Sequence, residues 1–188
     1  MKVIIDTSSL LSLVRYYLPF DKKTKLFDFI KSEIENGNLI LIDAVYQECE
    51  YTTQGLVLKS LDYLKDKDFK KHFKIPLRTK DLLPPSTKKF YNLLNNNFRT
   101  PLSRRLNDAE FEERKKEFLE TADARMIILA LIKKSAKKEI AIVTEESENG
   151  NDHKAFKKIP SICKMLDIKV MTLPDLLKIY QGIDIEFK

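Results

Sequence analysis

The sequence predicts an α/β fold in which helices cover both faces of a central parallel sheet. Four short apolar runs have the length of buried strands, and they span residues 2–5, 39–42, 139–143 and 168–171. The longer segments between them carry apolar residues at helical spacing. We expect a sheet of about four or five strands. Because no two runs are joined by the two-residue turn of a hairpin, these strands are expected to be parallel.

The first strand, residues 2–5, ends at Asp6. The polar side chains of residues 7–9 are expected to cap a helix that continues to about Val14. Apolar residues recur at helical spacing over 26–34, and Asn36-Gly37 follows as a helix stop signal.

The second strand, 39–42, ends at Asp43 and is followed by a predicted helix over 44–51. From residue 55 to about 119 no run resembles a strand, so this stretch is expected to be a helical insertion. Prolines divide it, and its later helices are expected over 87–94 and 108–119.

The strongest helical pattern covers 122–132, and the third strand follows at 139–143. A short helix over 159–166 has Pro160 as its second residue, a position that suits the first turn of a helix. The strand 168–171 and a closing helix over 173–180 complete the pattern.

Composition excludes several classes of protein. Two cysteines are too few for a disulfide scaffold, and two histidines nearly exclude a zinc centre with several imidazole ligands. None of the four glycines forms a dinucleotide-binding or P-loop motif. No stretch approaches the ~18 apolar residues of a membrane helix, and the start lacks the pattern of a signal peptide. We therefore expect a soluble, cytoplasmic protein without a membrane segment.

The net charge of +6 is concentrated in the middle of the chain. Residues 51–118 hold 16 basic and 9 acidic side chains, whereas the remainder is close to balanced. A basic segment beside an acidic site is what an enzyme acting on a polyanion needs. A solvated, lysine-rich helix surface is the equal alternative.

Acidic side chains follow three of the predicted strands. Asp6 comes directly after the first strand, Glu48 lies in the helix after the second, and Glu145 and Glu146 follow the third. Asp123 lies near the start of the helix 122–132, which is expected at the same edge. Because ligands bind outside the carboxyl ends of parallel strands, we expect several of these carboxylates in one pocket.

Such a cluster is costly unless a cation neutralises it. Mg²⁺ and Mn²⁺ prefer oxygen ligands and combine a few carboxylates with waters and substrate phosphate. A glycosidase also uses two carboxylates, but it requires neither the larger cluster nor the basic segment. The pattern therefore favours metal-dependent chemistry on a phosphate ester.

Together, the tripeptide 6–8 (Asp-Thr-Ser), Glu48, Asp123 and residues 143–146 (Val-Thr-Glu-Glu) resemble the PIN-domain nuclease family. This family, which includes the ribonuclease toxins of bacterial toxin–antitoxin pairs, typically shows D-[TS]-[NS] after its first strand and T-x-D at its fourth acidic position. The resemblance implies one three-layer, Rossmann-like domain over 1–188 with the insertion at about 55–119. It also implies a Mg²⁺- or Mn²⁺-dependent endoribonuclease, with an antitoxin protein and a second copy of the chain as further partners.

The resemblance implies that the catalytic groups and metal ligands are four acids: Asp6, Glu48, Asp123 and Glu146. Glu145 competes with Glu146 for the fourth position. Ser8 would support Asp6 through its hydroxyl, and Glu120, one turn before Asp123, is a further candidate.

Basic side chains in the insertion are candidates for contacts with RNA phosphates: Lys70, Lys71, Arg104 and Arg105. Solvated surface is an equal alternative for all four. His153 is expected to be merely exposed.

Two other functions compete with the nuclease. Glu instead of Asp at the fourth acidic position favours a module that kept the fold but lost catalysis, and that binds RNA or protein. A phosphatase of the D-x-D type is disfavoured, because Ser8 stands where the second Asp is required.

Overall fold

A parallel sheet of four strands, in the order β2-β1-β3-β4, lies at the centre of the structure, which is a computed structural model. It describes residues 1–148 and 154–179. The strands are β1 (Lys2–Ile5), β2 (Leu39–Ile40), β3 (Ile140–Val143) and β4 (Lys169–Met171). All three neighbouring pairs are parallel, as the sequence predicts.

The two central strands are buried on both faces. Val3 pairs with Leu39 of β2 on one side and with Ala141 of β3 on the other. Every residue of β3 is buried, and so are the last three residues of β1. A strand with helices on both sides has no polar face, which explains why these runs are apolar throughout.

Strand β2 is shorter than the predicted run 39–42, because the insertion takes over its last residues. Ile42 forms an isolated parallel bridge with Leu77. The amide of Leu77 donates to the carbonyl of Leu41 over 2.9 Å, and the amide of Asp43 donates to the carbonyl of Leu77 over 2.9 Å. Leu77 of the insertion therefore pairs with the residues that follow β2 at this edge of the sheet.

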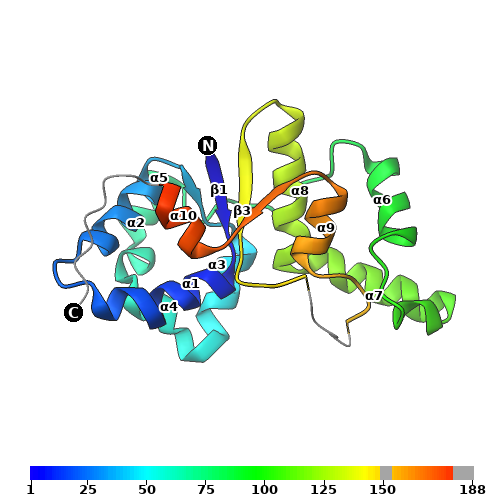
Figure 1. Ribbon diagram of the computed structural model, residues 1–188, viewed down its shortest axis with the longest axis horizontal. Helices are drawn as coiled ribbons and strands as arrows, with labels where there is room; N and C mark the ends of the chain where they lie inside the picture. The colour runs from blue at the N-terminus through cyan, green and yellow to red at the C-terminus, as the bar shows by residue number, and fades with distance from the viewer. Residues whose placement is uncertain (149–153, 180–188) are drawn as a thin grey trace.

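Helices cover both faces of the sheet and give a three-layer α/β/α arrangement (Figure 1). One group comprises α1 (Thr7–Ser12), α2 (Lys25–Glu35), α4 (Leu56–Ser60), α5 (Lys67–Phe73) and α10 (Leu173–Ile179). The other comprises α6 (Thr87–Asn96), α7 (Asp108–Glu120), α8 (Ala122–Ser135) and α9 (Ile159–Met165). Helix α3 (Asp43–Tyr51) contacts both α1 and α8.

Short helical turns link these elements: η1 (Leu13–Tyr17), η2 (Leu18–Phe20), η3 (Thr52–Gly55), η4 (Asp62–Lys65) and η5 (Ser103–Arg105). The predicted helices are present with shifted ends. The last one was expected to reach Tyr180, which lies outside the described residues.

The cap of the first helix differs from the prediction. Asp6 itself, and not a residue within 7–9, is the N-cap of α1, and its carboxylate accepts a hydrogen bond from the amide of Thr7. The α-helix ends at Ser12 and continues as a single π-helical turn, η1. Asp6 therefore ends β1 and begins α1, which fixes its carboxylate at the edge of the sheet.

The predicted insertion is helical and packs into the core. Phe98, between α6 and η5, is completely buried, and its ring meets that of Phe90 edge-on at 5.9 Å. Arg99 forms an antiparallel bridge with Phe156, and the amide of Thr100 donates to the carbonyl of Ala155. The insertion is thereby joined to the chain between β3 and α9.

Among the described residues, no helix is long and apolar enough to span a lipid bilayer.

Phe98→Ala is expected to lower the free energy of unfolding by about 3–5 kcal/mol, because it leaves a cavity in a closely packed interior. Urea denaturation measures this change. The matched variant Leu83→Ala removes a side chain that is 70% exposed in the same insertion, and it should cost less than about 0.5 kcal/mol. Similar losses for the two variants would contradict the packing described here.

Candidate functional site

The candidate site lies at the topological switch point of the sheet, where the order in which the strands are added reverses. β1 is followed along the chain by β2 on one side, while β3 and β4 lie on the other. The carboxyl ends of β1 and β3 therefore lie at the switch point of the sheet, which is where open α/β sheets bind ligands. The amide of Asp6 donates to the carbonyl of Val143 over 2.9 Å, so the two strand ends meet there.

The carboxylate of Asp6 is held by three donors. Oδ1 accepts from the amide of Thr7 at 2.7 Å. Oδ2 accepts from the Ser8 hydroxyl at 2.5 Å and from the Thr144 hydroxyl at 2.8 Å. Since Thr144 follows β3, these bonds join the ends of the two central strands. Ser8 thus occupies the supporting position that the resemblance implies for it.

Glu48 approaches the same site from α3. Its Oε2 accepts a hydrogen bond of 2.5 Å from the Thr7 hydroxyl. Burial raises the pKa of Glu48 above its ordinary value; the bond from Thr7 opposes this effect, the charge of Asp6 adds to it, and Lys154 opposes it. Asp6 and Glu48 are therefore close enough for the charge of one to change the pKa of the other.

Asp123, in the first turn of α8, has the most perturbed carboxylate of the site. Burial, followed by the negative charges of Glu146 and Asp6, raises the pKa of Asp123 to about 7. Lys154 lowers it, and Glu48 contributes a smaller increase. The pKa of Asp123 therefore responds to three carboxylates that come from three other segments of the chain.

Glu146 and Glu145 have different surroundings, which distinguishes the two candidates for the fourth position. Oε1 of Glu145 accepts from the amide of Leu173 at 2.7 Å and from the Ser9 hydroxyl at 3.2 Å, so Glu145 binds the start of α10. Glu146 is the neighbour that acts on Asp123, and its Oε2 accepts from the amide of Ile159 at 3.3 Å. The arrangement favours Glu146 as the fourth acid.

Glu120 lies outside this cluster. Its side chain is 71% exposed and pairs with the guanidinium of Arg125. Among the groups that shift the pKa of Asp123, Glu120 does not appear. The spacing of one helical turn suggested proximity, but a break at Thr121, which caps α8, separates Glu120 from the first turn of that helix.

Asp43, at the end of the predicted second strand, has a structural role. Its carboxylate accepts from the amide of Thr79 at 3.0 Å, from the Thr79 hydroxyl and from the amide of Ala44 at 3.0 Å. Although burial acts in the opposite direction, the bonds from Thr79 hold the pKa of Asp43 below its ordinary value. It fastens the loop after α5 to the start of α3.

Lys154 is a site residue that sequence reasoning missed. Its ammonium lies 4.0 Å from Oε1 of Glu146, and its charge lowers the pKa of both Asp123 and Glu48. The side chain is 61% exposed. In the sequence it is one lysine among several near residue 157, and only the antiparallel pairing with the insertion brings it to the acids.

The side chains here carry oxygen atoms, the type of ligand that a hard divalent cation prefers. They offer carboxylate oxygens from four segments beside the hydroxyls of Thr7, Ser8 and Thr144. Within 1–148 and 154–179, no group of three or more His, Cys, Asp or Glu forms a metal-holding cluster as the side chains stand. Mg²⁺ requires no such cage, because it usually keeps several waters and binds through one or two carboxylates.

In the described part of the chain, the four predicted phosphate contacts make no bond to the clustered acids, and their role remains a prediction. Lys70 contacts the Tyr46 hydroxyl at 3.3 Å and lies over its ring, while Arg104 and Arg105 are exposed in η5. Among the described residues, no hydrogen bond or ion pair joins Lys70, Lys71, Arg104 or Arg105 to the four clustered acids. His153 lies outside the described residues.

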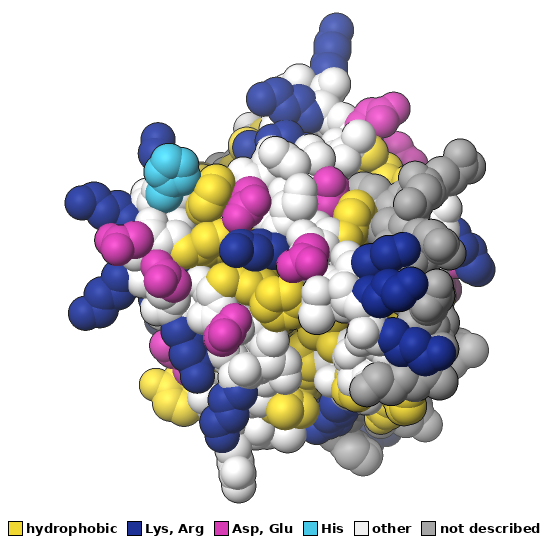
Figure 2. All heavy atoms as spheres, turned by 90° about the vertical axis from the view of Figure 1, so that its left-hand side faces the viewer, with side chains coloured by type: hydrophobic (Ala, Val, Ile, Leu, Met, Phe, Trp, Pro, Cys, Tyr) yellow, Lys and Arg dark blue, Asp and Glu magenta, His cyan; other side chains and the backbone are white. Residues whose placement is uncertain are grey.

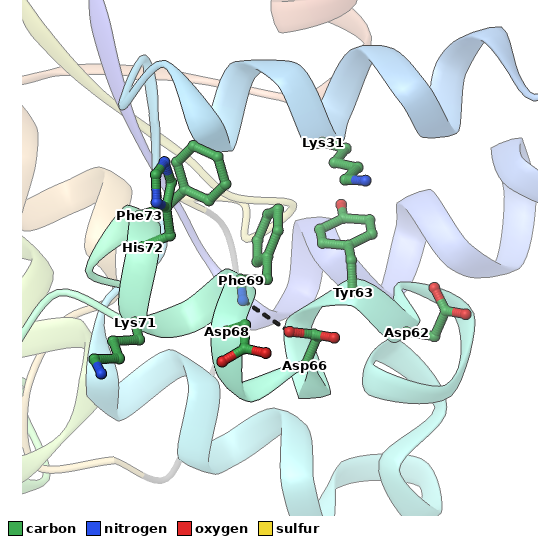
Figure 3. Close-up of a pocket in the computed structure, with 9 residues that line it drawn as sticks. All are labelled: Lys31, Asp62, Tyr63, Asp66, Asp68, Phe69, Lys71, His72 and Phe73. Carbon is green, nitrogen blue, oxygen red and sulfur yellow. Dashed lines mark hydrogen bonds between the residues drawn. The ribbon is translucent and has the colours of Figure 1, made fainter.

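Lys71 borders a different pocket, of about 840 Å³, between α2, η4 and α5 (Figure 3). The ammonium of Lys31 lies over the rings of Tyr63 and Phe69 there, at 5.8 and 5.7 Å from the ring centres. Acidic and basic side chains are interspersed around apolar ones on this face of the molecule (Figure 2). Such mixed charge gives no strong positive field for a polyanion.

Comparison with known proteins finds one family model, described as "Domain of unknown function (DUF4411)", which matches residues 85–182 and thus just over half of the chain. The matched range contains Asp123, Glu146 and Lys154, whereas Asp6 and Glu48 precede it. No curated protein matches the chain.

Asp123→Asn is expected to stabilise the metal-free protein at about pH 8. The folded protein has an Asp123 pKa of about 7, against 3.8 for an ordinary aspartate, so folding retains a proton that the unfolded chain releases between these values. Stability therefore falls as the pH rises through this window, and the loss is complete above about pH 7. The substitution should add about 2–4 kcal/mol at pH 8 and little at pH 4.

Urea denaturation in EDTA at the two pH values measures this difference. Glu120→Gln, on an exposed carboxylate outside the cluster, should show no such dependence on pH. An equal effect of Asp123→Asn at both pH values would contradict the prediction, since a change in packing does not depend on pH.

Proposed function

The chain belongs to the DUF4411 family, and we propose that it is a Mg²⁺- or Mn²⁺-dependent endoribonuclease that resembles the PIN-domain nucleases. The observation that carries this proposal is that Asp6, Glu48, Asp123 and Glu146 are electrostatic neighbours at the switch point of the sheet. Metal-dependent nucleases need such a group of carboxylates, whereas a structural role for it is hard to justify because like charges repel.

The raised pKa of Asp123 supports a metal-binding role. Burial is the largest cause of the pKa of about 7, and the charges of Glu146 and Asp6 raise it further although Lys154 lowers it. A divalent cation held by Asp6, Glu48, Asp123 and Glu146, directly or through water, would stabilise the ionised form of these carboxylates. When bound, it would lower the pKa of a water molecule and stabilise negative charge on the phosphate.

The surrounding residues orient the acids. Asp6 cannot rotate freely, because Thr7, Ser8 and Thr144 donate to both of its oxygens. Thr7 also donates to Glu48, so one residue positions two carboxylates. The exposed ammonium of Lys154 is available to a substrate phosphate beside the acids.

RNA is the proposed substrate because of the resemblance to ribonucleases, and the positive charge of the insertion agrees with a polyanion. We extend the proposal to the toxin of a toxin–antitoxin pair, with an antitoxin protein and a second copy of the chain as its partners in the cytoplasm.

A binding module without catalysis is the second candidate. The observation that favours it is the contact of Glu146 with Lys154, which gives the acids an internal counterion. The longer Glu at a position where the family typically has Asp points in the same direction. In such a module Lys154 would replace the metal ion.

Asp6→Asn and Asp123→Asn are each expected to reduce RNA cleavage in Mn²⁺ by about 100-fold or more, because each removes a charge that binds the cation. A gel assay on a labelled single-stranded RNA measures the rate, and EDTA should abolish it. Glu120→Gln should retain the rate within about twofold. Cleavage that persists in EDTA or in both Asn variants would contradict the proposal.

Metal binding separates the two candidate functions. A working site should stabilise the folded protein by about 2.7 kcal/mol at a Mn²⁺ concentration of about 100 times Kd, seen as a rise in Tm. Asp123→Asn should reduce this rise, and Glu120→Gln should leave it unchanged. No rise in the wild-type protein with Mg²⁺ or Mn²⁺ would favour the non-catalytic module.

A further inference from the structure

A pocket of about 410 Å³ opens beside Asp123. Four parts of the chain line it: the loop that precedes α7, helix α7, the start of α8, and residues 154–157. Its volume falls within the range of about 300–1,000 Å³ that is typical of small-molecule sites. The first two of these four parts belong to the insertion, so the insertion borders the candidate active site.

The pocket combines an apolar wall with a basic rim. Leu102, which is 41% exposed, and Leu106 contribute apolar surface, and the buried residues Phe118 and Phe156 also line the pocket. The basic side chains at the rim are Arg114, Lys154 and Lys157. The acidic residues are Asp123, at the end shared with the acid cluster, and Glu117, which already pairs with Arg114 at 2.8 Å.

The walls of the pocket are fixed by packing. The ring of Phe156 lies 4.6 Å from that of Phe118 and 5.8 Å from that of Phe111. The guanidinium of Arg99 lies 3.9 Å from the centre of the Phe111 ring. The amide of Lys157 donates to the carbonyl of Phe98 over 2.8 Å. This bond joins residues 154–157 to the insertion.

This combination matches the chemistry of a nucleotide. A base has a flat, largely apolar face that packs on apolar side chains, and its phosphates pair with Lys and Arg. The larger pocket of Figure 3 lacks this match, because Lys31 already lies over its rings and acids alternate with bases around it. None of its lining residues belongs to the acid cluster.

We propose that the pocket beside Asp123 binds one nucleotide of single-stranded RNA, with the base against Leu102 and Leu106 and the phosphates against Arg114 and Lys157. The pocket places this nucleotide next to the phosphodiester that faces Asp123. This inference rests on the proposed nuclease function and assigns to the insertion the binding of the substrate strand.

The first test measures the binding of a fluorescent single-stranded RNA of about ten nucleotides by anisotropy, in EDTA so that no cleavage occurs. Leu102→Glu puts a negative charge on the apolar wall and should weaken binding about tenfold or more. Leu83→Glu is the matched control, because it makes the same change at an exposed leucine of the insertion that does not line the pocket. Its effect should be less than about twofold.

The second test measures how binding depends on salt. A lysine that contacts a phosphate contributes about 0.7 to the slope of log K against log salt for a single strand. Lys157→Gln should reduce the slope by about that amount. Lys116→Gln, at an exposed position of α7 that does not line the pocket, should leave the slope unchanged.

Equal losses for Leu102→Glu and Leu83→Glu, an unchanged slope for Lys157→Gln, or no RNA binding by the wild-type protein would each overturn the pocket assignment. A cleavage assay in Mn²⁺ on the same RNA keeps the two proposals distinct. If the wild-type protein cleaves RNA and Leu102→Glu leaves KM unchanged, the pocket assignment fails and the nuclease stands. If RNA binding follows the expected pattern but no metal supports cleavage, the nuclease fails and the pocket assignment stands.

Discussion

The structure depends on the hydrogen bonds that Asp6 makes across the ends of β1 and β3. Its backbone amide binds Val143, and its carboxylate binds the hydroxyls of Ser8 and Thr144. A buried carboxylate is tolerated only when donors or a cation compensate its charge. These bonds compensate Asp6 and at the same time fix the two central strands to α1, so one residue connects the sheet with the candidate site.

The other acids add negative charge that these hydroxyls do not neutralise. Asp123 carries the consequence, because its pKa rises to about 7 under the influence of burial, Glu146 and Asp6. Lys154 offsets part of this charge. Its side chain is 61% exposed, so packing does not confine its ammonium to the acids.

The insertion contacts both the segment that carries Lys154 and the pocket beside Asp123. Its residues Phe98, Arg99 and Thr100 pair with the segment that carries Lys154, and its helix α7 provides a wall of the pocket beside Asp123. A segment that looks in the sequence like an addition to the fold thus determines what surrounds the acids.

The sequence by itself determined the strands, the layered fold and the acids at the strand ends. These are local features, because buried parallel strands must be apolar throughout and the residue after a strand necessarily lies at the sheet edge. It even ranked Glu146 by its spacing from Thr144, although it left Glu145 as a competitor. The tertiary structure alone decided that Glu145 caps α10, that Glu120 pairs with Arg125, and that Lys154 reaches the acids. Those contacts join residues through turns and pairings between distant segments, and no local pattern of residues encodes them.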